Sequence, residues 1–363
     1  MSLDLVGRAL RSRTLAALAS PHGVDRYLEQ VHPMWVAHDV RARVVDVRRE
    51  VDAAGQPVVS TLTLQPTSTW RGHRAGQHVS VGVELAGARR TTRVFSISSP
   101  DSRPGDRFTI TVRANPAVAD RPSVSSFLAE RARPGTLVHL SQAEGEFVLP
   151  DRVPEQLMLV SGGSGITPVM SMLRSLQRRT HRGRVTFLHY APSPDRLIYA
   201  TELDDIRRSG HGIDVHVLHP SHGDPYLSPA FLERLVPGHR DVLTYACGPA
   251  PLIEAIQAAY DGSDRLRVEW FKPPRTGGAA GGSLDFARTG LSVANDGGTL
   301  LEQAEAAGLR PESGCRMGIC FSCTTRKREG TVRNVLTGEI SARPDEDIRI
   351  CVSTAEGDCS VDL

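Results

Sequence analysis

Four of the six cysteines in this chain of 363 residues stand at spacings suited to a metal–thiolate centre. They are Cys315, Cys320, Cys323 and Cys351, separated by four, two and 27 intervening residues. Four thiolates can enclose a pair of irons if a tight loop turns its backbone N–H groups toward the sulfurs. The small residues Ser313, Gly314 and Gly318 suit such a loop.

Zinc is the alternative metal, since it also binds four thiolates. Zinc sites usually combine two close cysteine pairs, whereas here three cysteines share one loop and the fourth is distant. The pattern therefore favours a [2Fe–2S] cluster held by these four residues. Cys247 and Cys359 lie outside the pattern, and we do not expect them to be ligands.

A second chemical pattern lies at residues 157–168, where an apolar run is followed by a Gly-rich turn and a helix start. Gly162, Gly163 and Gly165 permit a tight turn and the close approach of a pyrophosphate to free N–H groups. We expect Thr167 to cap the helix and Pro168 to lie in its first turn. The segment predicts a dinucleotide site.

The segments that position these motifs show three different patterns of residue types along the chain. Between about residue 40 and residue 149, short β-rich runs separated by Gly, Pro and Asp predict an antiparallel barrel; these runs are 41–47, 58–64, 79–83 and 108–112. From residue 157, apolar strands alternate with helical segments, which predicts a parallel α/β domain; these strands are 157–160, 185–190, 213–218 and 242–246. Farther on, residues 284–293 predict a hairpin and 298–307 a helix.

The length and the composition predict several domains, because 363 residues exceed one ordinary core. The expected ranges are 1–35 for a helical extension, 36–152 for the barrel, 153–272 for the α/β domain, 273–282 for a Gly- and Pro-rich linker and 283–363 for the cysteine-containing domain. The last range holds 13 acidic and 9 basic residues, a net charge of −4, on a chain of net charge +2. This acidic module either docks on a basic surface or shows ordinary surface variation.

The N-terminal segment predicts an amphipathic helix that carries Arg8, Arg11 and Arg13. Such a helix either packs on its own protein or lies on a membrane surface. A membrane-bound partner is the other way in which the protein could contact a membrane. The sequence has no apolar run of 18 residues and no secretory signal, and its cysteine pattern favours a reducing compartment. These features predict a cytoplasmic protein, and nothing in the charge indicates a nucleic-acid partner.

Further segments resemble the ferredoxin–NADP reductase family. Residues 93–99 (RVFSISS) resemble its R-x-[YF]-S flavin motif, and 123–128 (SVSSFL) its second flavin segment, although Pro122 stands where the family has Gly. Residues 145–147 (GEF) resemble the end of its barrel, 161–168 its GG-x-G-[IV]-TP turn, 247–249 its C-G-P motif and 269–271 its E-x-F. Residues 283–363 resemble a plant-type ferredoxin domain.

The resemblance implies a role for particular residues. The flavin would be held by Arg93, Val94, Phe95, Ser96, Ser98, Ser125 and Ser126. The nicotinamide nucleotide would be held by Gly162, Gly163, Gly165, Thr167, Ser193, Arg196, Cys247, Gly248, Pro249 and Phe271. Ser96 and Cys247 would lie at the reacting centre. From its residue type alone, Cys247 also fits a small buried apolar side chain.

The resemblance implies FAD, with FMN as the alternative because of Pro122. It leaves the nicotinamide coenzyme open. Ser193 and Arg196 suit the 2′-phosphate of NADPH, and no acidic residue closes the strand before them, whereas Asp195 favours NADH. We expect NADPH.

The implied activity is electron transfer from NAD(P)H through flavin and the [2Fe–2S] cluster to a separate oxygenase, desaturase or cytochrome. The N-terminal extension resembles that of actinobacterial reductases that serve desaturases. Two alternatives remain: a direct reductase of quinones, ferric chelates or dyes, and a zinc-binding redox sensor or scaffold.

Overall fold

The computed structural model describes residues 23–52, 55, 57–85, 90–115, 123–210, 212–271, 280–314, 316–318 and 321–363. The expected helix before residue 23, the linker core at 272–279, Pro122, Cys315 and Cys320 lie outside these residues. The chain divides into two compact units, Met1–Glu269 and Trp270–Leu363. No helix of the described residues is long and apolar enough to cross a membrane.

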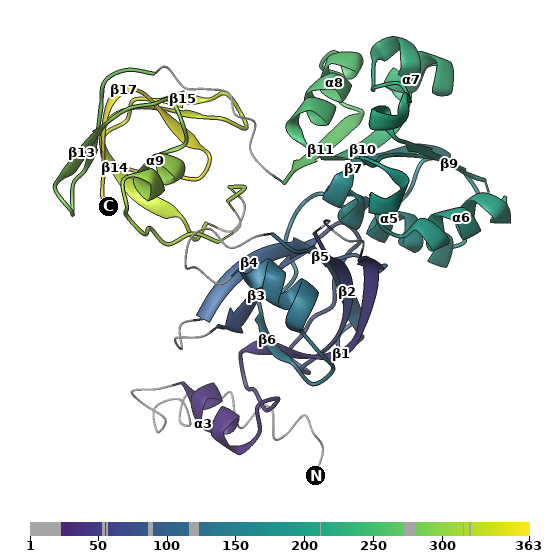
Figure 1. Cartoon of the computed structure of the whole chain (residues 1–363), viewed down its shortest axis with the longest axis horizontal. Coiled ribbons are helices and arrows are strands. Elements are labelled where there is room, and N and C mark those ends of the chain that lie inside the picture. Colours follow the sequence, from purple (N-terminus) through teal and green to yellow (C-terminus); the bar gives the residue numbers. More distant parts are fainter. Residues whose placement is uncertain are drawn as a thin grey trace. The chain divides into compact units, whose positions relative to one another are not determined.

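The first unit begins with helix α3 (Val24–Val31), which leads into an antiparallel sheet of six strands in the order β4-β3-β6-β1-β2-β5 (Figure 1). The strands are β1 (Val40–Val51), β2 (Val59–Pro66), β3 (His78–Glu84), β4 (Arg90–Ser96), β5 (Phe108–Arg113) and β6 (Leu137–Leu140). An antiparallel bridge from Ile97 to Ile110 joins the two edge strands, so the sheet closes into a barrel. Alternating apolar side chains fill it, with Trp70 stacked on Phe108 at 4.6 Å between ring centroids.

A short helical segment, α4 (Val124–Ser126) followed by a π-helical turn (Phe127–Arg131), covers the barrel beside β4 and β5.

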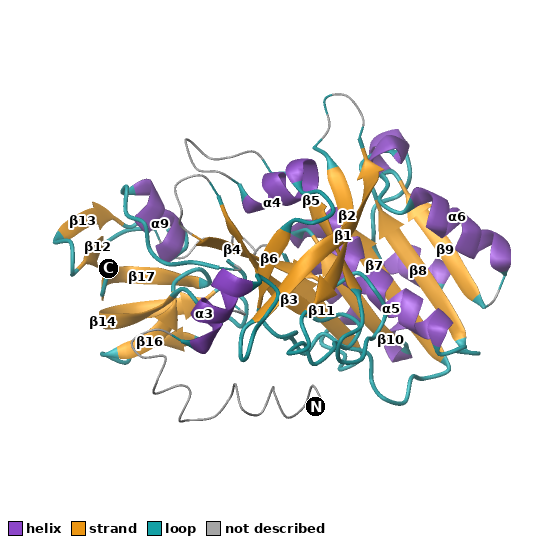
Figure 2. Ribbon diagram, turned by 90° about the horizontal axis from the view of Figure 1, so that it is seen from below, coloured by secondary structure: helices purple, strands orange, loops and turns teal. Residues whose placement is uncertain are grey.

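The remainder of this unit is a parallel sheet in the order β11-β10-β7-β8-β9. Its strands are β7 (Gln156–Gly162), β8 (Arg184–Tyr190), β9 (Ile213–Leu218), β10 (Leu243–Gly248) and β11 (Leu266–Trp270). Its helices are α5 (Ile166–Arg178), α6 (Ala200–Ser209), α7 (Pro229–Leu235) and α8 (Ala250–Tyr260), and Figure 2 shows α5 and α6 beside the strands.

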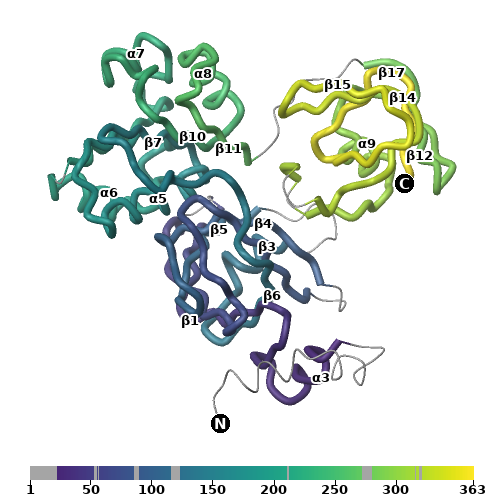
Figure 3. The backbone as a smooth tube through the Cα atoms, turned by 180° about the vertical axis from the view of Figure 1, so that it is seen from behind, coloured from purple at the N-terminus to yellow at the C-terminus, as the bar shows by residue number. Residues whose placement is uncertain are grey.

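The second unit is a mixed sheet in the order β13-β12-β17-β14-β15, with β16 paired to β14 (Figure 3). The strands are β12 (Ser283–Phe286), β13 (Leu291–Ala294), β14 (Thr324–Asn334), β15 (Ile340–Ser341), β16 (Glu346–Arg349) and β17 (Ser353–Val361). The first strand, β12, pairs in parallel with the last, β17, and helix α9 (Leu300–Ala306) packs on the sheet. This β-grasp arrangement, together with the barrel and the parallel sheet, confirms the predicted fold class.

Candidate active site

The closure of the barrel sets the backbone of the first flavin motif. Ser96 ends β4 and pairs with His78 of β3, and the next residue, Ile97, forms the closing bridge to β5. Arg93, Val94 and Phe95 of the same strand are partly buried, whereas Ser96 is buried. The motif therefore lies on a strand that is held from both sides by the barrel.

Ser98 is tied to both halves of the first unit. Its hydroxyl lies 2.8 Å from Thr109 Oγ1 and 3.1 Å from Thr111 Oγ1, on β5. The buried hydroxyl of Tyr199 donates to Thr111 Oγ1 at 2.5 Å, although Tyr199 precedes α6 of the parallel-sheet half. The Ser98 carbonyl accepts from the guanidinium of Arg174 on α5. The structure therefore places the Ser98 side chain in a hydroxyl network between the barrel and the parallel-sheet half.

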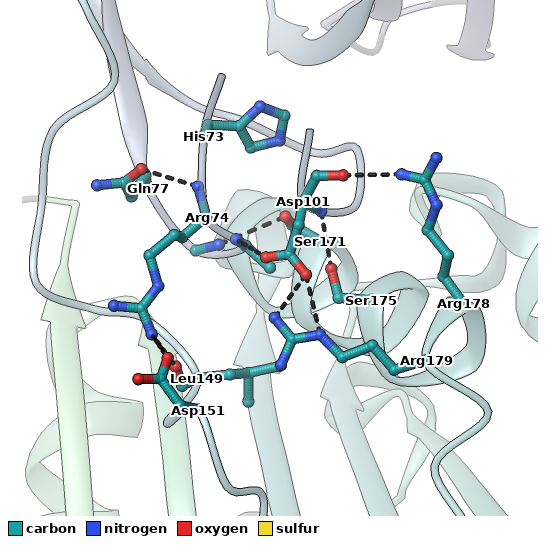
Figure 4. Close-up of polar contacts among 12 residues, drawn as sticks. His73, Arg74, Gln77, Asp101, Leu149, Asp151, Ser171, Ser175, Arg178 and Arg179 are labelled. Atoms are coloured by element: carbon teal, nitrogen blue, oxygen red, sulfur yellow. Dashed lines mark hydrogen bonds and ion pairs between the residues drawn. The ribbon is translucent and has the colours of Figure 1, made fainter. Parts of the chain in front are cut away.

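A second polar network joins α5 to the loop after β4 (Figure 4). Asp101 accepts from the backbone N–H of Ala75 at 2.7 Å and from Arg179 Nη2 at 2.6 Å, and its own N–H donates to Ser175 Oγ at 2.9 Å. Arg178 donates to the Asp101 carbonyl at 2.7 Å. Burial alone would raise the pKa of Asp101, but the Ala75 and Arg179 hydrogen bonds lower it, so the carboxylate stays charged. These contacts fix α5 against the flavin loop.

The second flavin segment forms a short capped helix. Ser123 Oγ accepts from the Ser126 N–H at 3.2 Å and lies 2.9 Å from Ser125 Oγ. Ser126 donates its hydroxyl to the Asn115 carbonyl at 2.5 Å. Because α4 lies against β4 and β5, the fold brings both predicted flavin segments to one side of the barrel.

The Gly-rich turn at the end of β7 packs directly on the C-G-P segment at the end of β10. A Cβ on Gly165 would lie 2.2 Å from the Cys247 carbonyl, and a Cβ on Gly162 would lie 2.9 Å from Pro249. Gly163 has φ +54° and open space where a side chain would stand. The turn therefore has the close packing and the exposed backbone that a pyrophosphate requires.

The prediction that Thr167 caps the helix is wrong. Helix α5 starts at Ile166 after a 3-10 turn (Gly163–Gly165), and Gly165 is the N-cap. The Thr167 hydroxyl instead donates back to the Ser164 carbonyl at 3.1 Å. The N-cap lies two residues before the predicted position because the 3-10 turn at Gly163–Gly165 continues directly into the helix.

The reacting centre predicted at Ser96 and Cys247 adjoins a buried acid. His78, the strand partner of Ser96, places Nδ1 4.0 Å from Glu269 Oε1. Burial, and then the Glu269 carboxyl, raise the pKa of the fully buried Cys247 thiol well above its ordinary value. Burial raises the pKa of Glu269 to about 8, and Glu269 Oε2 has no hydrogen-bond partner among the described residues. The centre is therefore largely uncharged at neutral pH, with one polar atom available to a bound group.

A hollow lies between the barrel and the Gly-rich turn. It is lined by Val51, Val59, Arg113, Gly163, Ser164 and Arg196, among others. Asp195, which is fully exposed, has its pKa lowered first by a hydrogen bond with Ser193 and also by Arg196 and His222. Arg196 thus lies at the hollow with the Asp195 carboxylate near it.

The cysteine-containing unit brings together two of the four predicted ligands. Cys323 Sγ lies 3.1 Å from Cys351 Sγ, well beyond the length of a disulfide bond. Both side chains are buried beside Ile348 and Val352. Gly318 has φ +75°, and a Cβ there would lie 2.9 Å from Val352, so the loop before Cys323 needs glycine at this position. Paired thiolates beside a tight loop fit a [2Fe–2S] cluster.

Cys359 lies on β17 between Leu284 of β12 and Gly330 of β14. Burial raises the pKa of its thiol to about 11, so it is a protonated sheet residue. Phe271 directly follows β11 and is partly buried.

Comparison with known proteins agrees with this geometry. The oxidoreductase NAD-binding domain matches residues 159–258, and the 2Fe-2S iron-sulfur cluster binding domain matches residues 286–356. An NADPH oxidoreductase of Mycobacterium tuberculosis is 36% identical over 98% of this chain and 92% of its own length. The phenoxybenzoate dioxygenase subunit beta of Ectopseudomonas oleovorans is 30% identical over 77% of this chain and 84% of its own length. Phthalate dioxygenase reductase shares the fold, with a TM-score of 0.59 at 23% identity over 90% of this chain and 98% of that chain.

The fold and the site define a flavin-dependent oxidoreductase with an iron–sulfur domain. The chain belongs to the family of ferredoxin–NADP reductase-type flavoproteins that carry a C-terminal plant-type [2Fe–2S] ferredoxin domain. It is an NAD(P)H-dependent enzyme whose cofactors are FAD, a pyridine nucleotide and a [2Fe–2S] cluster, and it transfers electrons to a separate redox acceptor.

Several residues of the site were missed from the sequence. Arg113 ends β5 and lines the hollow beside Gly163, and its only sequence signal was a cation at the end of a predicted strand. His78 and Glu269 are 191 positions apart, so no local pattern could pair them. Glu269 carried a signal in the E-x-F motif, whereas His78 carried none.

The buried acid yields a prediction about stability and pH. Glu269 is protonated in the native state up to a pH of about 8, but ionises near 4.5 when unfolded. The native state therefore binds the extra proton between these values, and the free energy of unfolding falls as the pH rises through this window. We expect Glu269→Gln to remove this part of the slope. Thermal unfolding of both proteins from pH 5 to pH 8.5 measures it, and equal slopes would show that Glu269 is ionised in the native state.

Proposed function

We propose that this protein delivers single electrons from NADPH to a separate oxygen-activating partner, namely an oxygenase, a desaturase or a cytochrome. The proposal rests on the position of Cys323 Sγ next to Cys351 Sγ. The same chain also contains the proposed nucleotide turn and the proposed flavin strand. Relatives named as a dioxygenase subunit and a dioxygenase reductase support an oxygenase as acceptor. The full-length match to an NADPH oxidoreductase supports the coenzyme.

We assign the flavin to residues 36–152, the nicotinamide nucleotide to 153–272 and the cluster to 283–363, with 273–282 as linker. Bound flavin accepts a hydride from the nicotinamide and releases its electrons one at a time. In this proposal Arg93, Ser125 and Ser126 bind flavin phosphate, while Val94, Phe95 and Ser96 orient the ring. The Ser98 hydroxyl network holds this strand in place.

The nicotinamide half supplies binding and exclusion of water. Gly162, Gly163, Gly165 and Thr167 form the pyrophosphate turn, and Cys247, Gly248, Pro249 and Phe271 surround the nicotinamide. The neutral Cys247 thiol and the protonated Glu269 keep the centre without net charge. Cys315, Cys320, Cys323 and Cys351 hold the cluster.

The route through the cluster is tested by Cys320→Ser. We expect NADPH-dependent reduction of ferricyanide to persist, because small oxidants reach reduced flavin directly, while reduction of cytochrome c falls at least tenfold. Cys359→Ser is the matched control and leaves both rates unchanged, since Cys359 lies in the sheet ladder. If Cys320→Ser reduces cytochrome c at the wild-type rate, the cluster is off the route and a direct quinone, ferric or dye reductase is the better description. Protein that contains zinc and no flavin would identify the sensor or scaffold.

The coenzyme is tested at Arg196 and its neighbour. Loss of a charge-assisted hydrogen bond costs about 1.5–3 kcal/mol, which corresponds to roughly a 10- to 100-fold rise in KM. We expect Arg196→Ala to raise KM for NADPH by this factor and to leave KM for NADH within about twofold. Asp195→Asn removes a carboxylate beside Arg196 and lowers KM for NADPH. Equal effects of Arg196→Ala on both coenzymes contradict the assignment of Ser193 and Arg196 to the 2′-phosphate.

We also propose a cytoplasmic protein that contacts the membrane surface through its N-terminal segment. Val31 at the end of α3 is 70% exposed and Trp35 is 55% exposed. The residues on either side of Val31 and Trp35 are joined, because Asp25 accepts from the backbone N–H groups of His38 and Asp39 at 3.0 and 3.1 Å. Arg41 adds an ion pair with Glu29 at 3.0 Å. Exposed tryptophan and valine on a fixed segment suit a bilayer interface.

Fractionation of cells tests this contact and the location together. We expect wild-type protein in both the cytoplasmic and the membrane fraction, and Val31→Ser/Trp35→Ser largely in the cytoplasmic fraction. Tyr226→Ser is the control, because Tyr226 is 75% exposed in the parallel-sheet half and lies outside the N-terminal segment. An unchanged distribution of the double variant rules out these residues as the contact.

A further inference from the structure

The junction between the barrel and the parallel-sheet half buries the side chain of one tyrosine. Tyr199 is 2% exposed, and its hydroxyl donates to Thr111 Oγ1 of β5 at 2.5 Å. Burial raises the pKa of Tyr199, so the hydroxyl stays protonated and remains a donor. A buried tyrosine hydroxyl ordinarily has a hydrogen-bond partner, so this bond alone indicates only a satisfied side chain. The backbone and the neighbours of Tyr199 distinguish it from that ordinary case.

The backbone of Tyr199 adopts a conformation that disfavours a bulky side chain. Its φ is +61° and its ψ is 30°, in the left-handed region where large residues are uncommon. Tyr199 is the N-cap of α6, yet its side chain makes no capping hydrogen bond, as Ser, Thr, Asp or Asn would at such a position. The residue therefore serves neither the local backbone nor the helix start. A strained residue that its surroundings hold in place indicates a function beyond folding.

The ring of Tyr199 lies against a cation from the neighbouring helix. The guanidinium carbon of Arg174 on α5 lies 4.5 Å from the ring centroid. Arg174 is held in turn by Glu202 of α6, through Nε to Oε1 at 2.8 Å and through Nη2 to Oε2 at 2.6 Å. The ring is therefore held by the parallel-sheet half and the hydroxyl by the barrel, so that Tyr199 spans the junction.

The acceptor of the tyrosine bond leads to the flavin motif. Thr111 Oγ1 also lies 3.1 Å from Ser98 Oγ, and Ser98 follows the predicted flavin residue Ser96 by two positions. In the parallel-sheet half, Tyr199 follows the predicted nucleotide residue Arg196 by three positions. One hydroxyl therefore connects the segment assigned to the flavin with the segment assigned to the nucleotide.

We propose that Tyr199 is a positioning residue for hydride transfer, and that its bond to Thr111 sets the distance between the nicotinamide and the flavin. This inference rests on the proposed function. In the transfer, a hydride with its two electrons leaves NADPH for the flavin, so NADPH is oxidised to NADP+ and the flavin is reduced. Tyr199 contacts neither reactant in this proposal and acts through Thr111 and Ser98.

The expected consequence is a loss of rate rather than a loss of affinity. A displacement of the reactants by roughly 1 Å can slow such a transfer by about 100-fold. The pyrophosphate turn belongs to the parallel-sheet half and does not depend on the Tyr199 hydroxyl. Loss of the hydroxyl therefore lowers the rate at saturating NADPH and leaves the affinity for NADPH largely unchanged.

The test uses the full-length holoprotein and removes one hydroxyl at a time. Tyr199→Phe removes the donor and keeps the ring beside Arg174. Thr111→Val removes the acceptor from the barrel, whereas Thr111→Ser keeps a hydroxyl there and is the conservative variant. Tyr260→Phe is the matched control, because Tyr260 is 1% exposed and its hydroxyl also lies 2.5 Å from a threonine, Thr244 Oγ1, within the parallel-sheet half.

Three kinds of measurement separate positioning from folding. Stopped-flow absorbance gives the rate of flavin reduction at saturating NADPH and the apparent Kd for NADPH. Flavin content and thermal unfolding report the integrity of each variant. The long-wavelength absorbance that appears when NADP+ is added to the protein with reduced flavin reports contact between the two rings without turnover.

We expect Tyr199→Phe and Thr111→Val to lower the rate of flavin reduction at least tenfold and the long-wavelength absorbance at least threefold. The apparent Kd and the flavin content should stay within twofold of wild type, because the hydroxyl touches neither bound group. Thr111→Ser should retain at least a third of the wild-type rate. Tyr260→Phe should match wild type in rate and absorbance, although it loses a bond of the same kind.

The proposal is overturned if Tyr199→Phe keeps the wild-type rate or the wild-type absorbance, if Tyr260→Phe loses as much rate, or if flavin content falls by the same factor as the rate. If Tyr199→Phe does not fold, equal rates in Thr111→Val and Thr111→Ser overturn it. Wild-type protein whose flavin is reduced by NADH and not by NADPH would instead contradict the proposed function, and the same variants are then compared with NADH.

Discussion

The partly buried guanidinium of Arg174 is the constraint on which the first unit depends. It forms a bidentate ion pair with Glu202, at 2.6 and 2.8 Å, lies 4.5 Å from the centroid of the Tyr199 ring and donates to the Ser98 carbonyl. A cation removed from water must keep all of its partners, because leaving one unpaired is costly. These contacts join α5 to the start of α6 and to the segment after β4. The barrel and the parallel sheet are therefore held in a defined relation at the point where their motifs meet.

Further polar contacts join the barrel to the parallel-sheet half in the same way. Tyr199 reaches from α6 to Thr111 of the barrel, and Asp101 reaches from the barrel to Ser175 and Arg179 on α5. Tyr199 adopts a left-handed conformation at φ +61°, which aims its ring at the barrel. Hydride transfer requires its two rings in contact, so a firm junction between the two halves suits the proposal that one binds the flavin and the other the nicotinamide.

The second unit meets a different structural requirement, since a cluster must be enclosed and yet remain close to the surface. The core of the sheet buries Cys323 and Cys351, while the loop between β-grasp elements relies on positive φ angles at Arg316, Gly318 and Phe321. Arg316 is held by a bidentate ion pair with Glu305 of α9, at 2.6 and 2.7 Å. The unit thus combines a conventional apolar core with a loop whose shape is imposed by a few polar contacts.

Local spacing in the sequence indicated the [2Fe–2S] cluster, the dinucleotide turn, the barrel, the parallel sheet and most of the strands, whereas the flavin and the ferredoxin domain were implied by the family resemblance. Cysteine intervals, a Gly-rich turn and alternating apolar residues act over a few positions, so they can be interpreted without knowing the fold. The expected hairpin at 284–293 and helix at 298–307 are confirmed by β12, β13 and α9 for the same reason. The site residues taken from the motifs remain predictions, although the fold places the two flavin segments on one side of the barrel.

Only the tertiary structure decided which distant side chains meet. Tyr199 bonds Thr111 across 88 positions, and His78 approaches Glu269 across 191, so their pairing depends on strand register and helix placement. The helix start at Ile166 and the left-handed Phe321 were decided in the same way, by contacts that override local preference. Spacing in the sequence identifies functional groups that lie only a few positions apart in the chain. Burial, pKa shifts and the presentation of the cluster loop arise from packing between segments that are remote in the chain.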